Sequence, residues 1–267
     1  MEIHLSGSRA VVTGGGGGIG RVIAETFARE GIRVHVCDVD GRALERLTAR
    51  NKTITATVAD VSKSLEVDRL FGDAVQSLGG LDILINNAGI AGPTAPVEEI
   101  SDEDWEHTLA VNINGQFYCA KKAIPLIKAA GGGSIVNVSS AAIWKGGFPR
   151  RLPYATSKVA VLGFTQTLAM DAGPSNIRVN AVLPGTILGD RLNRVLEARS
   201  KLTGVSAEEI FKRVVASSSM RSAVTEQEVA NLVCFLCSDE ARPISGQTIT
   251  VCGNFEGHHS ADWDVNR

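Results

Sequence analysis

The chain has 267 residues, of which 44% are hydrophobic, and this composition excludes a disordered protein and fits one α/β domain or two small ones. Its formal net charge of -2 gives no reason to expect nucleic acid or a membrane surface as a partner, so a small-molecule ligand is the default expectation. No apolar run reaches the roughly 18 residues of a membrane span, and residues 1–4 lack the basic start of a secretion signal, so we expect a cytoplasmic protein.

Seven short runs rich in β-branched residues are predicted strands, and amphipathic helical stretches separate them. The runs are residues 9–13, 33–38, 54–58, 83–86, 134–138, 178–182 and 248–251. Helices are expected between them, for example at 21–30, 62–78 and 105–130. This order predicts an α/β fold in which a doubly wound, parallel, seven-stranded sheet carries helices on both faces.

No linker or repeat divides the chain, so we expect a single domain over residues 1–267. The stretch 189–219 interrupts the alternation with charged helical segments and is long enough to be a lid over a site, and residues 255–267 form a tail. The five cysteines are odd in number and scattered, which argues against a disulfide framework. Cys234 and Cys237 have redox or metal-ligand spacing, but they lie in an apolar helical stretch, so we expect a buried helix there.

A glycine turn with the sequence TGGGGGIG, residues 13–20, follows the first predicted strand and precedes a helix. This order lets backbone approach a pyrophosphate while the helix N-terminus faces its charge. Two registers fit the run: Gly15, Gly17 and Gly20 match the dinucleotide fingerprint, and Gly14, Gly18 and Gly20 match a Gly-x-x-x-Gly-x-Gly variant. The residues leave the register open, and a merely flexible turn is the alternative.

Asp38 ends the second predicted strand, where a carboxylate can accept hydrogen bonds from the adenosine ribose and repel a 2′-phosphate. No Lys or Arg in the glycine turn offsets that repulsion, so NAD is favoured over NADP. Asp40 is the rival for this role, although it lies beyond the strand end, and a helix cap or turn is the alternative for either carboxylate.

Tyr154 and Lys158 lie four residues apart, so on a helix they stack on one face. The ammonium then favours the ionised form of the phenol, and this makes the tyrosine a usable proton-transfer group. Ser140 lies fourteen residues upstream of Tyr154, and Ser139 is its rival. Alternation from Val138 would turn the two serines in opposite directions, and a Ser-Ser strand end can also be a turn signal.

These residues together resemble the short-chain dehydrogenase/reductase family, over nearly the whole chain. The glycine turn, Asn86-Asn-Ala-Gly89, Asn112, Ser140, Tyr154-x-x-x-Lys158 and Pro184-Gly185 occur in that family's order and at about its spacing. The resemblance implies a Rossmann fold, with Tyr154 as general acid/base and Ser140 as hydrogen-bond donor to the substrate oxygen. It also implies that Lys158 binds the nicotinamide ribose and favours the ionised phenol, and that Asn112 holds a proton-relay water.

The resemblance further implies a set of contacts to an NAD cofactor. The residues are Gly14, Gly18, Ile19, Gly20, Asp38, Asp60, Val61, Asn87, Ala88, Gly89, Tyr154, Lys158, Pro184, Gly185 and Ile187. Several of them follow strand ends, where ordinary turn chemistry is the alternative.

The chain departs from the family pattern in three places. Ser140 and Tyr154 are one residue further apart than is commonest, so we expect the loop 141–153 to bulge. Gly189 stands where the family often has a threonine that touches the carboxamide, which puts that contact in doubt. Cys252-Gly253-Asn254 replaces the usual Asp-Gly-Gly ending. In the tail, His258 and His259 have no carboxylate or cysteine beside them, so we expect no catalytic metal.

Members of this family are commonly homotetramers built through two long helices beside the reaction centre and through the last strand. The chain has apolar residues in those helices, namely Phe117, Leu126, Val161, Phe164 and Leu168. We therefore expect a homotetramer.

Basic residues gather around the expected mouth of the site. The loop 141–153 carries Lys145, Arg150 and Arg151 and no acid, and the lid has six basic against four acidic residues. Such a surplus can steer an anionic substrate, and either arginine can grip a carboxylate, sulfonate or phosphate. A solvated surface is the alternative. The candidate substrate contacts are Ser140, Trp144, Arg150 and Arg151.

The sequence therefore predicts an NAD-dependent dehydrogenase acting on a secondary alcohol, such as a sugar, a polyol or an acidic hydroxy compound. The alternatives are a ketone or 3-oxoacyl reductase, a regulator that binds NAD without turnover, and an epimerase or dehydratase. A regulator needs only the glycine turn and Asp38, so the presence of Asn112, Ser140, Tyr154 and Lys158 argues against it. The chain has little room for the larger substrate domain of the epimerases.

Overall fold

A parallel sheet of seven strands runs through the centre of the molecule. The computed structural model describes residues 5, 7–143 and 148–255. The strands are β1 (Arg9–Thr13), β2 (Arg33–Asp38), β3 (Ile54–Val58), β4 (Ile83–Asn86), β5 (Gly133–Val138), β6 (Ile177–Pro184) and β7 (Thr248–Val251). Their order in the sheet is β3-β2-β1-β4-β5-β6-β7, and every neighbouring pair is parallel. The predicted doubly wound α/β sheet is thereby confirmed.

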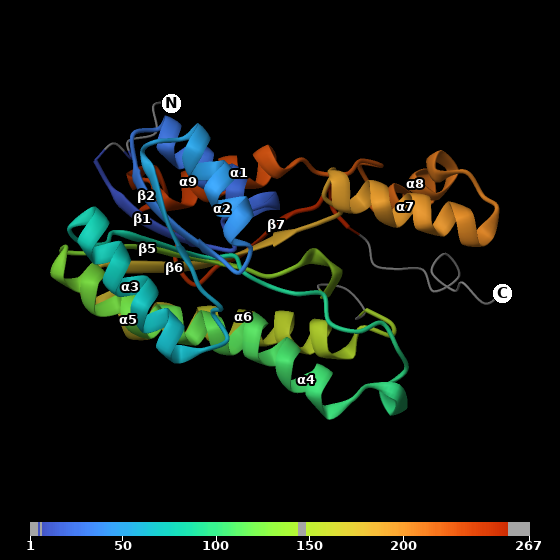
Figure 1. Ribbon diagram of the computed structural model, residues 1–267, viewed down its shortest axis with the longest axis horizontal. Helices are drawn as coiled ribbons and strands as arrows, with labels where there is room; N and C mark the ends of the chain where they lie inside the picture. The colour runs from blue at the N-terminus through green and yellow to red at the C-terminus, as the bar shows by residue number, and fades with distance from the viewer. Residues whose placement is uncertain (1–4, 6, 144–147, 256–267) are drawn as a thin grey trace.

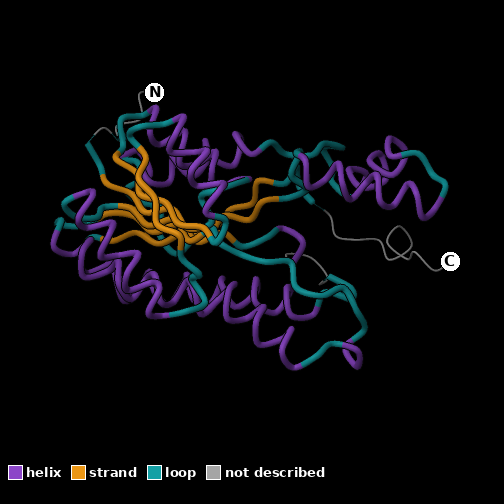
Figure 2. Tube along the Cα trace, in the orientation of Figure 1, coloured by secondary structure: helices purple, strands orange, loops and turns teal. Residues whose placement is uncertain are grey.

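Helices cover both faces of this sheet, and Figure 2 shows the strands as a layer between two layers of helices. The α-helices are α1 (Gly18–Arg29), α2 (Gly41–Arg50), α3 (Ser64–Leu78), α4 (Asp102–Leu109), α5 (Gly115–Ala129), α6 (Leu152–Ala172), α7 (Asp190–Thr203), α8 (Ala207–Ala216) and α9 (Glu226–Cys237). Helices α1, α2 and α9 lie on one face, and α3, α5 and α6 lie on the other, with α4 beside α6 (Figure 1).

Successive residues of the central strands feed two separate layers of the core. On β1, Ala10 and Val12 pack with Phe27 of α1, whereas Val11 packs with Leu70 of α3. All five side chains are fully buried. Burial of a side chain of the size of Phe27 or Leu70 contributes roughly 1.5 to 3 kcal/mol. The two layers therefore fix the strands, and with them the loops at the strand ends.

The predicted helix over 105–130 is interrupted, which corrects that expectation. Helix α4 ends at Leu109, a π-helical turn covers Ala110–Asn114, and α5 begins at Gly115. Two contacts explain the interruption. The Asn112 amide is drawn inward, where its Oδ1 accepts from Ile90 N at 2.8 Å and its Nδ2 donates to Ile90 O at 3.0 Å. A Cβ on Gly115 would lie 2.8 Å from Val61 Cγ2, so the helix approaches the loop after β3 closely. A π turn adds a residue to the helix and is common at functional sites.

Most of the apolar residues predicted for subunit contacts are engaged in the core. Phe117 is 48% exposed, but Leu126, Phe164 and Leu168 are only partly exposed and pack against the core. Val161 is fully buried, so its assignment to a subunit contact is wrong, because α6 turns that residue toward the sheet. The tetramer itself stays a prediction.

Helices α7 and α8, which cover most of the predicted lid, pack against each other and project beyond the edge of the sheet (Figure 1). They are joined through Gly204, which caps α7 in the left-handed conformation at φ +71°. The rest of the predicted tail beyond Phe255 lies outside the described residues. Among the described helices, none combines the length and the apolar composition needed to cross a bilayer.

All five cysteines lie in the described part of the chain, and they are buried and free. Burial raises the pKa of the Cys37, Cys234 and Cys237 thiols to about 12. The buried-helix prediction for the Cys234–Cys237 pair is confirmed, since both belong to α9 and face the core.

A buried histidine lies between β2 and β3. His35 is 2% exposed, with Nδ1 2.7 Å from Thr55 Oγ1 and Nε2 3.0 Å from Thr57 Oγ1. Thr57 donates its own proton to Asp73 Oδ2 at 2.6 Å, so its oxygen accepts from His35 and the neutral ring carries its proton on Nε2. Burial lowers the pKa of His35 to about 4, against a smaller opposing effect of the Asp73 charge.

Candidate active site

A cavity of about 880 Å³ opens at the carboxyl ends of the strands. Its walls come from the glycine turn, the ends of β2, β3 and β4, the start of α6 and the segment that leads from β6 into α7. The order of the sheet reverses between β1 and β4, and in open parallel sheets ligands bind at such a reversal.

The glycine turn has a backbone that only one of the two predicted registers explains. Gly14 and Gly18 have φ of +64° and +51°, the left-handed region that favours glycine. A Cβ on Gly20 would collide with the carbonyl oxygen of Gly14, so α1 starts in direct contact with the turn. Gly17 is extended and has open space where a side chain would be. The geometry therefore fits the register Gly14, Gly18 and Gly20.

A loop after β4 closes over this turn. Asn87 Nδ2 donates to the carbonyl oxygens of Thr13 at 3.0 Å and Gly14 at 3.2 Å, and Ala88 N donates to Thr13 Oγ1 at 3.0 Å. Asn87, Ala88 and Gly89 all line the cavity. The loop and the turn thus form one bonded unit, with Ile19 at the edge of the same cavity.

Asp38 and its rival Asp40 have different tasks. Asp38 lines the cavity, where its Oδ2 accepts from Gly16 N at 3.0 Å and its Oδ1 from Asp40 N at 3.1 Å. Asp40 caps α2, since its Oδ1 accepts from Ala43 N at 3.0 Å. Asp38 is therefore the carboxylate that a ligand in the cavity would meet.

The remaining predicted cofactor contacts lie along the same wall. Asp60 and Val61 follow β3. Pro184 ends β6, and Gly185 and Ile187 follow it. All five line the cavity. A Cβ on Gly185 would lie 2.8 Å from Cys252 Cα, so the chain passes close to the segment after β7 there. Gly189, where the family often has a threonine, is the N-cap of α7 and also lines the cavity.

The two serines at the end of β5 make different hydrogen bonds. Ser139 Oγ donates to the backbone oxygen of Lys158 at 2.7 Å, which commits its proton to holding α6 against the sheet. Ser140 Oγ accepts from Ala142 N at 3.3 Å, so its proton can point elsewhere. Because Ser140 lines the cavity, it can donate to an oxygen of a ligand.

Tyr154 and Lys158 occupy one face of α6 at the cavity. The Lys158 ammonium nitrogen lies 5.9 Å from the centroid of the Tyr154 ring and donates to Val138 O at 3.0 Å. Lys158 is 4% exposed, and this burial lowers its pKa to about 8. Among the ion pairs of the described residues, none involves Lys158, so its charge meets the Val138 carbonyl and the Tyr154 ring but no carboxylate.

Asn112 lies behind the cavity and is fully buried. Its Nδ2 donates to Ser157 Oγ at 3.0 Å, and Ser157 donates to the backbone oxygen of Tyr154 at 2.8 Å. This network ties the π turn to the first turn of α6 and so fixes the position of the tyrosine. Ser157 was not among the predicted site residues, and nothing in its sequence context marks it beyond its place between Tyr154 and Lys158.

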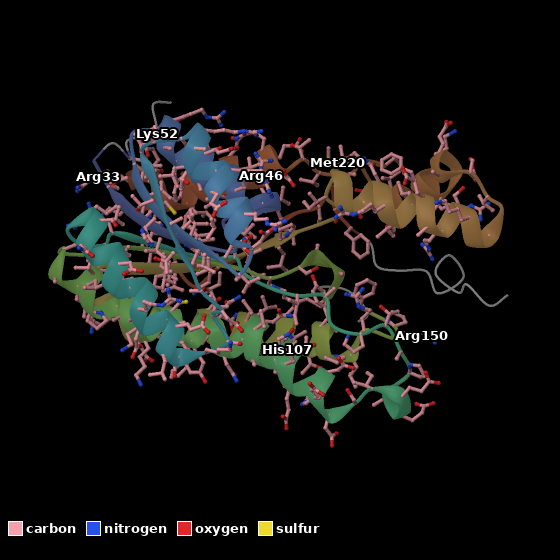
Figure 3. The ribbon with its side chains drawn as sticks, viewed as in Figure 1. Arg33, Arg46, Lys52, His107, Arg150 and Met220 are labelled. Carbon is pink, nitrogen blue, oxygen red and sulfur yellow. The ribbon has the colours of Figure 1, made fainter. Side chains whose placement is uncertain are left out.

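The candidate substrate contacts separate into three groups. Trp144 lies outside the described residues. Arg150 is exposed and does not line the cavity, and its φ of 59° is rare for a residue other than glycine. Figure 3 shows it in the lower half of the view with His107. Arg151 lines the cavity and donates from Nη2 to Ala91 O at 2.7 Å.

Several apolar residues complete the cavity although sequence reasoning did not single them out. Phe148, Leu192, Val195 and Phe255 line it, and two of them belong to α7. Val195 is 44% exposed and lies on the cavity side of α7, so a ligand in the cavity would cover it. The predicted lid therefore contributes directly to the cavity.

The arrangement combines a phenol, a buried ammonium and a serine hydroxyl at one end of a cavity whose other end has a glycine turn and a carboxylate. A phenol and a hydroxyl aimed at one ligand oxygen can exchange its proton and stabilise negative charge on it. The glycine turn supplies backbone N–H groups and a helix N-terminus, which suit a diphosphate. The residues present therefore fit a nicotinamide dinucleotide.

Comparison with known proteins gives the same picture at the level of the whole chain. Residues 14–255 match the family model described as enoyl-(acyl carrier protein) reductase. The chain is 37% identical over 255 residues to an uncharacterised oxidoreductase of Thermotoga maritima, which covers 94% of this chain and 98% of that protein. It is 34% identical over 254 residues to the human dehydrogenase/reductase SDR family member 4, which covers 93% of this chain and 87% of that protein.

Solved structures with bound cofactors share the fold. L-sorbose reductase from Gluconobacter frateurii, complexed with NADPH and L-sorbose, has a TM-score of 0.88 at 30% identity and covers 96% of this chain and 98% of that one. An NAD+-bound xylitol dehydrogenase has a TM-score of 0.86 at 30% identity, and the match covers 93% of this chain and 99% of that one. A 7α-hydroxysteroid dehydrogenase complexed with NADH and 7-oxo glycochenodeoxycholic acid has a TM-score of 0.85 at 32% identity. The match covers 94% of this chain and 95% of that one.

Proposed function

The chain belongs to the short-chain dehydrogenase/reductase family, and from that premise we propose that it transfers a hydride between NAD and a secondary alcohol or ketone. The observation that carries this proposal is the meeting of Tyr154, Lys158 and Ser140 at one end of a cavity whose other end is the glycine turn with Asp38. A protein that only bound the dinucleotide would need the second end alone.

Each residue has a task in the oxidation of an alcohol. The bound nicotinamide supplies the hydride acceptor. Tyr154 takes the hydroxyl proton as the carbon loses its hydride, and Ser140 donates a hydrogen bond to the oxygen while negative charge develops on it. Lys158 keeps a positive charge beside the phenol and favours its ionised form. Asn112 and Ser157 hold the tyrosine in place, since Asn112 Nδ2 donates to Ser157 Oγ and Ser157 Oγ donates to Tyr154 O. The family resemblance is the sole support for a relay water at Asn112, because its side-chain amide is already bonded to Ile90 and Ser157.

We infer NAD rather than NADP from the end of β2. The Asp38 carboxylate faces the cavity there, and a 2′-phosphate would meet its charge. The residues of the glycine turn, 13–20, bring no basic side chain to offset that repulsion. Solved relatives are described with NAD+, NADH or NADPH, so the family alone does not decide the cofactor.

The cavity favours a hydroxylated substrate with an apolar part. Leu192 and Val195 of α7 offer an apolar wall opposite the polar end, and Arg151 brings one permanent positive charge. The solved relatives include an L-sorbose reductase, a xylitol dehydrogenase and a hydroxysteroid dehydrogenase with a bile-acid conjugate. Sugars, polyols and acidic hydroxy compounds are therefore the first substrates to test.

We propose that α7 and α8 form the lid over this substrate. We also propose that the working form is a homotetramer, which light scattering would test.

A substrate screen followed by one substitution tests the function. Purified protein is supplied with NAD or NADP and a panel of alcohols, sugars, polyols and hydroxy acids, and with NADH and the matching ketones and 3-oxoacyl compounds. We expect NAD-dependent turnover, and a fall in kcat/KM of about a thousandfold for Tyr154→Phe, since the phenol is the proton acceptor. Turnover of the ketones alone would identify a reductase, and tight NAD binding without turnover would identify a regulator.

A further inference from the structure

A second cation lies against the ring of Tyr154. The guanidinium carbon of Arg151 is 5.1 Å from the centroid of the Tyr154 ring and 5.2 Å from that of Phe148. The two rings are 6.2 Å apart at an angle of 70°, so the guanidinium lies in the angle between them. Contacts of a cation with an aromatic ring at this distance are attractive.

Three contacts hold Arg151 in this place. Its backbone caps α6, where Ala155 N donates to Arg151 O at 2.8 Å, and its own N donates to Phe148 O at 3.2 Å. Its Nη2 donates to Ala91 O at 2.7 Å, in the loop that follows β4. The arginine therefore spans from the loop on the cofactor side of the cavity to the first turn of α6. Arg151 is the N-cap of α6 and Tyr154 lies in the first turn of that helix, so the two side chains meet at the start of α6.

The charge of Arg151 differs from that of Lys158 in its permanence. A guanidinium stays protonated at every pH at which a protein is folded, because its pKa exceeds about 12. Burial lowers the pKa of Lys158 to about 8, so Lys158 loses its charge as pH rises through the range in which a phenol begins to ionise. Above that pH the guanidinium is the cation that remains beside the ring.

We propose that Arg151 is a positioning residue for the reaction, which holds the Tyr154 ring and keeps a permanent positive charge against it, where that charge stabilises the phenolate that accepts the substrate proton. This inference rests on the proposed function, in which Tyr154 exchanges the proton. Besides Arg151, the ionisable residues of the described chain that line the same cavity are Cys37, Asp38, Asp60, His107, Tyr154, Lys158 and Glu226. Of these, Lys158 also lies against the Tyr154 ring, with its ammonium nitrogen 5.9 Å from the ring centroid.

The chain offers a direct measurement, because it contains only two tyrosines. Tyr118→Phe removes the other one, which lies on α5 away from the cavity, and preserves the packing of its ring. In that background the near-ultraviolet absorbance of phenolate, followed against pH, reports Tyr154 alone. Circular dichroism at each pH shows whether the protein remains folded.

We expect Arg151→Gln to move the midpoint of this titration upward by about one pH unit, since it removes the cation that lies 5.1 Å from the ring centroid and stabilises the phenolate. Arg151→Lys keeps a charge and should recover at least half of the shift. Arg33→Gln makes the same change of charge at the start of β2, at the end of the molecule away from Arg150 in Figure 3, and should leave the midpoint in place. Coincident curves for the wild type and Arg151→Gln would overturn the proposal.

Activity gives a second readout that separates this inference from the proposed function. The pH dependence of kcat/KM should move in the same direction in Arg151→Gln, with the fall concentrated in kcat below the new midpoint. A rise in KM for anionic substrates alone, with an unchanged titration, would mean that Arg151 grips the substrate instead. Because the titration needs no substrate, it decides about Arg151 even if the wild type turns over nothing in the panel.

Discussion

Two regions of the molecule each bury an ionisable side chain, but they differ in its hydrogen-bond partners and in its charge at neutral pH. Between β2 and β3, His35 has a hydroxyl partner for both ring nitrogens and lies in its neutral form. At the cavity, Lys158 is buried almost as completely, but its partner is one carbonyl oxygen. The first region is arranged for stability, whereas the second retains a charge that the folded chain does not neutralise, as functional sites often do.

The two pKa values express this difference in terms of pH. Burial lowers both, to about 4 for His35 and about 8 for Lys158. At neutral pH the histidine is therefore neutral and contributes nothing unfavourable, while the lysine is still charged inside the protein. Between about pH 4 and 6.5, the His35 side chain is protonated in the unfolded chain but not in the folded one. The same holds for Lys158 between about pH 8 and 10.5.

Lys158→Met tests the region at the cavity and should have the largest effect on activity and stability. We expect turnover to fall about a thousandfold, because the ammonium beside the phenol is lost. We also expect the free energy of unfolding to rise by about 2 kcal/mol at pH 7, because an uncompensated buried charge is replaced by an apolar chain of similar length. The gain should shrink as pH rises from about 8 to 10.5, where the wild-type lysine loses its proton.

Urea denaturation of both proteins across this pH range measures the gain. Lys52→Met is the matched control, because Lys52 is exposed in the turn before β3 and should change stability by less than about 0.5 kcal/mol. A Lys158→Met protein that is less stable than the wild type at pH 7 would break the comparison between the two regions.

His35→Gln tests the other region. A glutamine keeps polar atoms near Thr55 and Thr57 but does not titrate. The folded wild type holds the neutral ring, so its stability is fully present above about pH 6.5 and is lost as pH falls toward about 4. We expect the wild type to lose about 3 kcal/mol more than His35→Gln over that interval, from a shift of about 2.5 units. Stability curves that stay parallel between pH 7 and 4 would contradict this account.

Asp38→Asn should have the smallest of these effects, and it tests a carboxylate at the cavity end of the strand that carries His35. Asp38 ends the same strand as His35, but its carboxylate faces the cavity. The asparagine oxygen can still accept from Gly16 N, so stability should change little. We expect KM for NAD to rise by about tenfold and KM for NADP to fall, because the repulsion of a 2′-phosphate is removed. Asp40→Asn caps α2 equally well and should leave the preference unchanged in a comparison of kcat/KM for the two cofactors.

The sheet and the two layers of helices could be predicted from the sequence because the central strands, such as β1, β4 and β5, are buried on both faces. Such strands read as apolar runs, and the glycines mark the turns between them. The catalytic end was predictable for a similar local reason, since a tyrosine and a lysine four apart can only share a face on a helix. The choice between Ser139 and Ser140 came from the resemblance, and the structure adds the hydrogen bond from Ser139 to Lys158 O that accounts for it.

The features that escaped prediction depend on tertiary contacts. The π turn follows from the amide of Asn112 reaching Ile90, which is 22 residues away in the chain. Ser157 matters through its bonds to Asn112 and Tyr154, and no local pattern announces them. Arg150 and Arg151 are neighbours with the same chemistry, yet Arg151 lines the cavity, whereas Arg150 is exposed and has a left-handed backbone.

The burial of all five cysteines makes the molecule convenient for site-specific labelling. A cysteine introduced in place of Lys201, which is exposed in the last turn of α7, would be the one thiol within reach of a maleimide dye in the native protein. An environment-sensitive fluorophore attached there would report in real time whether α7 and α8 move when a dinucleotide is added. No native cysteine would have to be removed first, so the labelled protein would retain its own core.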